Sequence, residues 1–356
     1  MANSSILFET KHLAMLWEKY YDSGNNNTVK CKLCAHYCTI DEHKRGTCLT
    51  RINEGGILYS LTYGKAESYS IDPIEKKPFF HFKPGSKALS FGANGCNFSC
   101  LHCQNHHLSQ VFRTVGRRQP QTSGYSPETL AEIAINKIAD GIAYTYSEPT
   151  IFFEYARDTI LACREMPETK NLFHVFVSNG YFSTELIDLF VQEDLISAVN
   201  IDLKFIDDEK YRRISGARLE PILRNIKLLN QLKDKIHIEI INLIIPGEND
   251  DENSIRRTAE FICSVDPDIP LHFTRFYPHY NMSSKNPTNI NILLRAREIA
   301  YETGLKYVYV GNTIQKNVEN TYCPNCKELL IARDRYFLES NVFKNIAGTK
   351  NPKCPK

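Results

Sequence analysis

From about residue 88 onward, short apolar runs alternate with segments of helical periodicity. The runs are rich in β-branched and aromatic residues and end in Gly, Asn or Pro, as strands closed by turns do. One helical segment opens with Ser126-Pro127-Glu128, the pattern of an N-cap, a proline at the first helical position and an early acid. Repeated βα units with short links predict an α/β fold with a parallel sheet, either open and doubly wound or a barrel. The buried face of that helical segment comprises Leu130, Ile133, Ala134 and Ile138.

Polar residues that could carry chemistry lie where the predicted strands end. In parallel α/β sheets sites form at this edge, because the loops that follow the strands meet there. Asp202 and Lys204 are two residues apart in one strand, so both side chains point to the same face. A structural ion pair and a site inside a barrel both fit these two residues. The full set is Cys96 to Cys103, Ser147 and Glu148, Asn179 and Gly180, Asp202 and Lys204, and Asn249 and Asp250.

Composition and charge place the chain among globular proteins. Of its 356 residues, 42% are hydrophobic and 24% are charged, which is typical of soluble domains. No apolar run approaches the roughly 20 residues that a membrane helix needs, so no membrane partner is expected. The formal net charge is only +2, and a dedicated nucleic-acid binder would carry a strong basic excess.

The N-terminal stretch MANSSILFETKHLAMLWEKYY is interpreted as a short amphipathic helix. Glu9, Lys11 and Glu18 interrupt its apolar residues, so no signal peptide is expected. We therefore expect a cytoplasmic protein.

Twelve cysteines are the unusual feature of the composition. The cytosol keeps thiols reduced, so disulfides are not expected. Ten of the cysteines form three groups, at 31–48, 96–103 and 323–354. Cys163 and Cys263 stand alone in helix-like apolar contexts, which is typical of ordinary buried cysteines.

The central group, Cys96-x3-Cys100-x2-Cys103, supplies three thiolates where closed metal sites use four. It could be a zinc site completed by His102, His106 or His107, or a redox thiol set. The interpretation we favour is an iron–sulfur cluster with three protein ligands. Its fourth iron would then stay free to bind a small molecule.

The two flanking groups differ in completeness. Cys31-x2-Cys34-x3-Cys38-x9-Cys48 offers four thiolates within eighteen positions, enough for a closed site that holds either zinc or an auxiliary iron–sulfur cluster. Cys323, Cys326 and Cys354 give only three thiolates. No metal is predicted for this last group.

With these motifs in place, the chain resembles the radical S-adenosylmethionine (radical SAM) superfamily. The resemblance implies a partial (β/α)6 TIM-like barrel and a [4Fe-4S] cluster on Cys96, Cys100 and Cys103, whose unique iron binds S-adenosylmethionine. It implies reductive cleavage of that cofactor to a 5′-deoxyadenosyl radical, which abstracts hydrogen from a substrate. AYTYSEPT, VSNGY and NIDLKF resemble the cofactor-binding strand ends of the glycyl-radical-enzyme activating branch. Implied cofactor-binding residues are therefore Ser147, Glu148, Asn179, Asp202 and Lys204.

Within that branch, nearly the whole chain resembles the radical SAM member of the AmmeMemoRadiSam system, which is related to pyruvate formate-lyase activating enzyme. Motifs such as CKLCAHYC, DPIEKKPFFHF and INLIIPGEND carry this resemblance. It implies an oxidoreductase with a flavodoxin or ferredoxin as electron donor, and with AMMECR-like and Memo-like partner proteins. The expected organisation is a Cys-rich N-terminal segment at 1–86, a barrel at 87–313 and a zinc-ribbon-like remnant at 314–356.

Two alternatives stay open at this point. One is a catalytically inactive, metal-stapled scaffold that binds partner proteins, and the other is a radical SAM enzyme that modifies RNA. The segment DPIEKKPFFHF at 72–82 is either a solvated linker held by its prolines or a segment over the barrel mouth that shapes the substrate site.

Overall fold

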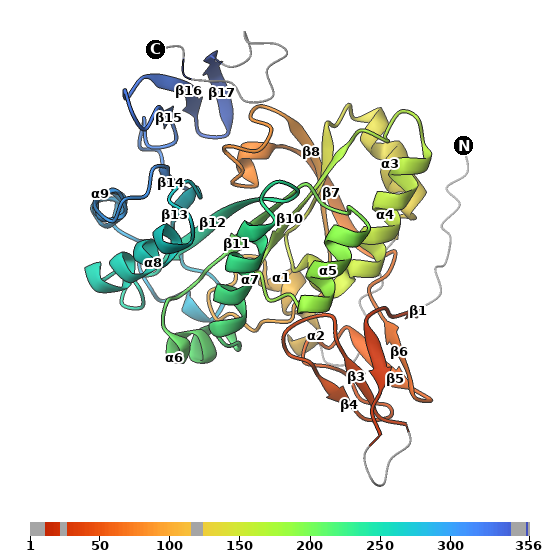
Figure 1. Cartoon of the computed structure of the whole chain (residues 1–356). Helices are drawn as coiled ribbons and strands as arrows, with labels where there is room; N and C mark the ends of the chain where they lie inside the picture. Colours follow the sequence, from red (N-terminus) through yellow and green to blue (C-terminus); the bar gives the residue numbers. More distant parts are fainter. Residues whose placement is uncertain (1–10, 22–26, 115–123, 343–353, 355–356) are drawn as a thin grey trace.

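The fold is dominated by one large sheet, seen in a computed structural model that describes residues 11–21, 27–114, 124–342 and 354 (Figure 1). Its strand order is β14-β13-β12-β11-β10-β9-β8-β7. Every neighbouring pair from β8 to β14 is parallel, and only β7 runs antiparallel, against β8. The strands are β7 (Ala66–Pro73), β8 (Lys87–Ala93), β9 (Gly141–Tyr144), β10 (Phe173–Ser178), β11 (Ala198–Asp202), β12 (His237–Ile244), β13 (Leu271–Arg275) and β14 (Val308–Gly311).

This topology confirms the predicted α/β fold with a large, mostly parallel sheet. Each of the seven predicted strands is present, from β8 to β14. Their order follows the chain in one direction, whereas a doubly wound sheet reverses direction at its middle. In the described part of the chain β7 and β14 are the two edges of the sheet, which is therefore open.

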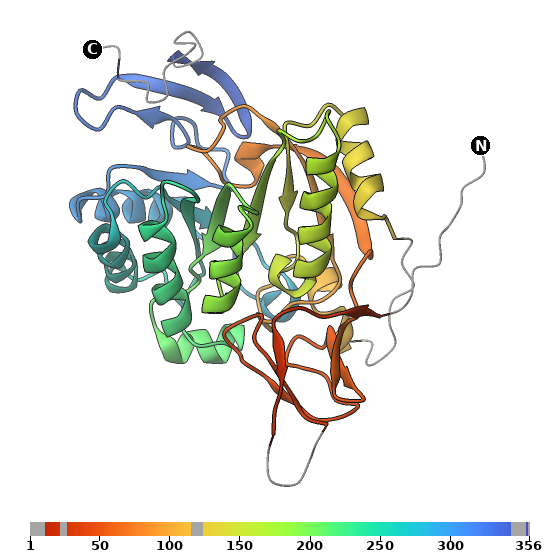
Figure 2. The same cartoon turned by 45° about the vertical axis from the view of Figure 1, so that its right-hand side comes forward.

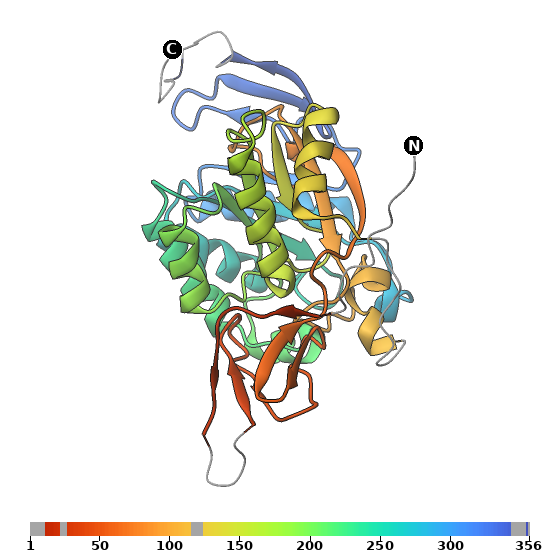
Figure 3. The same ribbon diagram turned by 90° about the vertical axis from the view of Figure 1, so that its right-hand side faces the viewer.

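Helices follow the strands and pack on one side of the sheet, as the side view shows (Figure 3). In α3, Ser126 caps the first turn by accepting from the Thr129 backbone N–H at 3.1 Å, and Pro127 takes the first helical position, as predicted. Ile138 was expected on the buried face, but it is 83% exposed, because α3 ends at Asn136. The main helices are α3 (Pro127–Asn136), α4 (Phe153–Glu165), α5 (Thr184–Gln192), α7 (Glu220–Gln231), α8 (Glu252–Val265) and α9 (Ile290–Glu302).

The predicted N-terminal helix is wrong for residues 11–21, and residues 1–10 lie outside the described part of the chain. These residues form two short strands that pair with later parts of the chain, β1 with β6 and β2 with β3. Backbone pairing with distant strands overrides the weak local helical pattern. The small sheets β1-β6-β5 and β2-β3-β4 comprise β1 (His12–Leu13), β2 (Trp17–Lys19), β3 (Val29–Cys31), β4 (Thr39–Ile40), β5 (Arg51–Glu54) and β6 (Ile57–Ser60).

The small N-terminal sheets and the C-terminal sheet lie at opposite ends of the large sheet (Figure 2). Thr50, before β5, contacts the loop that follows β8, where the parallel strands end. Arg333 of the C-terminal sheet instead donates at 2.6 Å to the Phe80 carbonyl, close to where the strands begin. The C-terminal sheet consists of β15 (Thr321–Tyr322), β16 (Leu329–Asp334) and β17 (Phe337–Asn341).

Residues 74–85, here called the floor segment, close the end where the parallel strands begin. Phe79 is fully buried and packs among residues near the strand starts, including Ala88 and Ala198. Glu239 of β12 accepts hydrogen bonds from the backbone N–H groups of Phe80, His81 and Phe82. The interpretation of a solvated linker is therefore wrong, and the segment lies opposite the edge where the strands end.

In the residues that the structure describes, no helix combines the length and the apolar character needed to cross a bilayer.

Candidate functional site

The three-cysteine loop follows β8 and is held by backbone pairing with a distant segment. Ser99 N–H donates to the Ser215 carbonyl at 3.0 Å, and Leu101 N–H donates to the Ile214 carbonyl at 2.9 Å. Gly95 precedes the first cysteine with a φ of 104°, and a Cβ there would lie 2.4 Å from Thr50 Cγ2. Glycine is thus required both by conformation and by close packing. The backbone pairing on one side and the packing against Thr50 on the other therefore fix the shape of the loop.

Two thiols of this loop, Cys96 and Cys100, lie in surroundings that disfavour the free thiolate. Burial raises the pKa of the Cys100 thiol to about 11 and that of Cys96 well above its usual range. A metal centre would supply the positive charge that stabilises the thiolates. Burial also lowers the pKa of His102 to about 3, and its Nδ1 atom has no hydrogen-bond partner among the described residues.

Glu148 follows β9 and is almost completely buried. Its Oε1 accepts from Thr150 Oγ1 at 2.6 Å and from Ser178 Oγ at 2.7 Å, while Oε2 accepts from the Asn179 backbone N–H at 2.8 Å. Burial raises the pKa of the Glu148 carboxyl above its usual range, although these hydrogen bonds act in the opposite direction. The carboxylate thus joins the ends of β9 and β10, and Oε2 keeps capacity for a further donor.

Asn179 and Ser147 tie these strand ends to the cysteine loop. Asn179 Nδ2 donates to Asn97 Oδ1 at 2.7 Å, directly beside Cys96, and its Oδ1 accepts from the Tyr181 backbone N–H at 3.0 Å. Ser147 Oγ donates to the Ala93 carbonyl at the end of β8. Each of the two side chains therefore links a strand end to the β8 end or to the loop that follows it.

Asp202 and Lys204 form an ion pair through Asp202 Oδ2 and Lys204 Nζ. Burial alone would lower the pKa of Lys204, but the Asp202 carboxylate outweighs it, so the pKa is raised and the amine is charged. The second oxygen, Asp202 Oδ1, is buried and has no hydrogen-bond partner among the described residues. A buried acceptor without a partner is costly, so the pair is suited to receive a donor from a ligand.

All eight residues predicted for the cluster and the cofactor line one cavity of about 510 Å³. This volume falls within the range of small-molecule sites, about 300–1,000 Å³. The cavity lies against the inner face of the sheet, because residues of successive strands that point away from the helices line it, such as Val177, Ile241 and Thr274. The eight are Cys96, Cys100, Cys103, Ser147, Glu148, Asn179, Asp202 and Lys204.

The end of the cavity nearer the strand starts contains further residues, of which sequence reasoning missed Glu319, Tyr336 and His272. Glu319 and Tyr336 reach it from the C-terminal part of the chain, and His272 reaches it from β13. Lys77 of the floor segment is buried there, with its Nζ 2.8 Å from Asp72 Oδ2 and 4.4 Å from the Tyr146 ring centre. No local motif marks Glu319 or Tyr336, because their position depends on how the C-terminal sheet docks.

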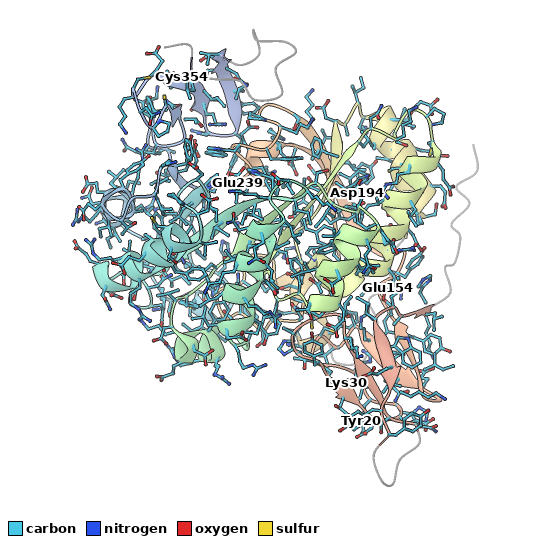
Figure 4. The ribbon with its side chains drawn as sticks, viewed as in Figure 1. Tyr20, Lys30, Glu154, Asp194, Glu239 and Cys354 are labelled. Carbon is cyan, nitrogen blue, oxygen red and sulfur yellow. The ribbon has the colours of Figure 1, made fainter. Side chains whose placement is uncertain are left out.

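The other two cysteine groups also assemble. Cys31, Cys34, Cys38 and Cys48 surround a small void next to Arg51. Near the C-terminus, the sulfur atoms of Cys323, Cys326 and Cys354 all lie within 4.8 Å of one another (Figure 4 labels Cys354). Among the described residues this is the one set of three or more potential ligand atoms so closely packed. The structure therefore brings together a thiol set for which no metal was predicted.

The large cavity fits the cofactors that the sequence implies. Three thiols from one loop lie at its wall, and they are spaced more widely than ligands of a single ion would be. None of the three loop histidines joins them at single-ion spacing within the described residues. The unpartnered Asp202 Oδ1 suits an ammonium group, and the charged Lys204 suits a carboxylate. An amino acid moiety carries both groups.

Comparisons with known proteins agree with this site. The radical SAM superfamily model matches residues 91–262. A protein named "Uncharacterized protein MJ0808" from Methanocaldococcus jannaschii is 40% identical over 338 residues, which cover 94% of this chain and 96% of that protein. Pyruvate formate-lyase 1-activating enzyme from Escherichia coli strain K12 is 24% identical over 182 residues, covering 50% of this chain and 69% of the enzyme.

Among solved structures, a radical SAM methyltransferase from Sphaerobacter thermophilus has a TM-score of 0.51 at 10% sequence identity, covering 65% of this chain and 68% of that one. At this identity the likeness concerns the fold alone. The matched residues span β8 to α8 and include the three-cysteine loop, Glu148, Asp202 and Lys204. Residues 91–262 therefore form a radical SAM superfamily domain within this chain.

Proposed function

We propose that the protein is a radical SAM oxidoreductase of the activating-enzyme type. It cleaves S-adenosylmethionine reductively at a [4Fe-4S] cluster and abstracts hydrogen from a substrate. The observation that carries the proposal is the convergence of three loop thiols and five polar strand-end residues on one cavity. We further propose that the sequentially ordered sheet is a partial (β/α)6 barrel with small Cys-rich attachments at 1–86 and 314–356.

Each residue has a role that follows from its chemistry. Cys96, Cys100 and Cys103 would hold the cluster, which supplies the electron when reduced. Lys204 would bind the carboxylate of the cofactor as a compact cation, and Asp202 Oδ1 would accept from its amino group. Ser147, Glu148 and Asn179 would fix the strand ends around the cofactor, since their hydrogen bonds already connect β8, β9 and β10.

The substrate would meet the end of the cavity nearer the strand starts. That end carries charged and polar groups from the floor segment and the C-terminal sheet, including Lys77, Glu319 and Tyr336. We therefore propose a substrate with polar groups near the reacting C–H bond. A cytoplasmic location, a flavodoxin or ferredoxin donor, and AMMECR-like and Memo-like partners are part of the same proposal.

The direct test is turnover without oxygen. Purified protein with reconstituted iron and sulfide is mixed with S-adenosylmethionine and dithionite, and 5′-deoxyadenosine is measured by chromatography. Production that depends on iron supports the proposal. A protein that holds full iron and sulfide but forms no 5′-deoxyadenosine contradicts it.

Lys204→Met is expected to weaken the binding of S-adenosylmethionine by roughly 10- to 100-fold, because a charged hydrogen bond contributes about 1.5–3 kcal/mol. The variant keeps the length of the side chain but leaves Asp202 without its cation. Equilibrium dialysis of labelled cofactor gives the dissociation constant. Lys233→Met is the matched control, because Lys233 is an exposed lysine paired with Asp266 at 2.7 Å. Equal affinities for the two variants would contradict the role of Lys204.

A further inference from the structure

The four N-terminal cysteines come from two connections, β3 to β4 and β4 to β5, and line one void. Cys31 ends β3, Cys34 and Cys38 lie between β3 and β4, and Cys48 precedes β5. Together they line a void of about 10 Å³, roughly the space of one water molecule. Four thiols around a central space form a closed donor set, unlike the three thiols at the large cavity.

The spacing of these thiols separates two kinds of metal centre. Zinc binds thiolates at about 2.3 Å in a tetrahedron, which places the sulfur atoms about 3.8 Å apart. The described C-terminal set, Cys323, Cys326 and Cys354, meets a limit of 4.8 Å, whereas no three of the N-terminal thiols do. An iron–sulfur cluster puts several irons and sulfides between its ligands and therefore needs a wider set.

A buried arginine beside the void also favours an iron–sulfur cluster over zinc. Arg51 is 1% exposed, and its Nη2 donates to Glu154 Oε2 at 2.7 Å (Glu154 is labelled in Figure 4). Its Nε–H is buried and has no hydrogen-bond partner among the described residues. Backbone N–H of Thr47 also donates to Cys38 Sγ at 3.4 Å. N–H groups around sulfur are the contacts that set the reduction potential of an iron–sulfur cluster.

Two contacts connect this set directly to the three-cysteine loop. Arg113 donates to the Thr47 carbonyl at 2.9 Å and to the Cys96 carbonyl at 3.2 Å, and thereby joins the neighbour of Cys48 to a loop cysteine. His36 Nε2 lies 2.9 Å from the carbonyl oxygen of Asn97, the residue after Cys96. The two thiol sets are thus separated by a few hydrogen-bonded residues.

We propose that Cys31, Cys34, Cys38 and Cys48 hold a second iron–sulfur cluster that passes electrons to the cluster of the three-cysteine loop. A one-electron carrier protein of the flavin or iron–sulfur class reduces the N-terminal cluster by one electron. That cluster then reduces the loop cluster by one electron and returns to its oxidised state, and no proton or bond changes. The nature of the cluster stands on the cysteine geometry, whereas the relay rests on the proposed function.

Metal content tests the nature of the cluster. Wild type, a variant with Cys96→Ala, Cys100→Ala and Cys103→Ala, and a variant with Cys34→Ala and Cys38→Ala are reconstituted without oxygen. Iron, sulfide and zinc per chain are then measured. Each variant is expected to keep part of the wild-type iron, with an amount of sulfide equal to the remaining iron. The proposal is overturned if the loop variant contains no iron, or if zinc disappears on replacing Cys34 and Cys38. The loop variant answers the question even where the other fails to fold, and Cys263→Ala serves as the control for cysteine replacement.

Electron paramagnetic resonance tests the relay. In wild type reduced at both clusters, spin–spin interaction is expected to broaden the spectrum beyond the sum of the two variants' spectra. A simple sum would place the clusters too far apart and overturn the relay. A wild type that shows both clusters and their interaction but forms no 5′-deoxyadenosine would contradict the proposed function and leave the second cluster standing.

Discussion

Replacement of Cys100 by alanine is expected to abolish the formation of 5′-deoxyadenosine from S-adenosylmethionine. Cys100 is the most buried thiol of the loop, at 6% exposed. A ligand from solvent would therefore not reach the cluster to replace its thiolate. Two remaining thiolates cannot hold a four-iron cluster of which one iron is already without a protein ligand. Turnover under dithionite, followed by chromatography, measures the loss, and circular dichroism shows that the sheet has formed.

Cys163→Ala is the matched control for this experiment. Cys163 of α4 is also fully buried, and burial likewise raises its pKa, to about 12, but it lies in the core outside the cavity. This variant is expected to retain the wild-type rate. Undiminished turnover by Cys100→Ala would mean that the loop does not hold the reacting cluster.

Glu239→Gln is expected to lower the free energy of unfolding by about 3–5 kcal/mol, the usual effect of breaking a buried charge cluster on one side. The Glu239 side chain, labelled in Figure 4, is fully buried and accepts from three backbone N–H groups of the floor segment. It also accepts from His272 Nε2 at 2.7 Å and lies 3.1 Å from His237 Nε2. Glutamine preserves the shape, but its NH₂ group would face donors. Urea unfolding measures the change.

An exposed glutamate gives the comparison. Glu302→Gln removes surface ion pairs with Arg256 and Arg295 and is expected to leave the free energy of unfolding nearly unchanged, because solvent screens exposed ion pairs. Burial acts to raise the pKa of Glu239, but the hydrogen bonds from His237 and His272 outweigh it, so the pKa lies well below the ordinary value. The stabilisation is therefore present above that ordinary value and is lost as the pH falls through the folded-state pKa. Similar losses for the two variants would show that Glu239 does not hold the floor segment.

The sequence predicted the parts of the fold that depend on local pattern. All seven parallel strands coincide with apolar runs, and Ser126 caps α3 as expected. The three loop cysteines and five polar residues were each assigned to a strand end, and the sequential order of the strands places them around one cavity. Their binding of cluster and cofactor stays a prediction.

What the sequence did not predict depends on contacts between distant residues. Residues 12–13 and 17–19 form strands because β6 and β3 pair with them, and no local sequence pattern identifies those partners. The sequence left residues 72–82 open between a solvated linker and a segment that shapes the substrate site, because the hydrogen bonds from this segment to Glu239 span about half the chain. The position of Glu319 and Tyr336 in the cavity wall also depends on a long-range contact, because Arg333 fixes the C-terminal sheet to Phe80.

Because the large sheet is open, side-chain contacts determine the separation of its two edges. Because the edges β7 and β14 do not pair in the described structure, no ladder of backbone hydrogen bonds sets the width of the gap between them. Side chains span it instead, among them His81, 2.7 Å from the Tyr309 hydroxyl, and Arg333 on the Phe80 carbonyl. Among the described residues, only side-chain contacts join the two edges at the floor segment, so the separation of the edges can change without breaking a strand ladder, as a closed barrel would require.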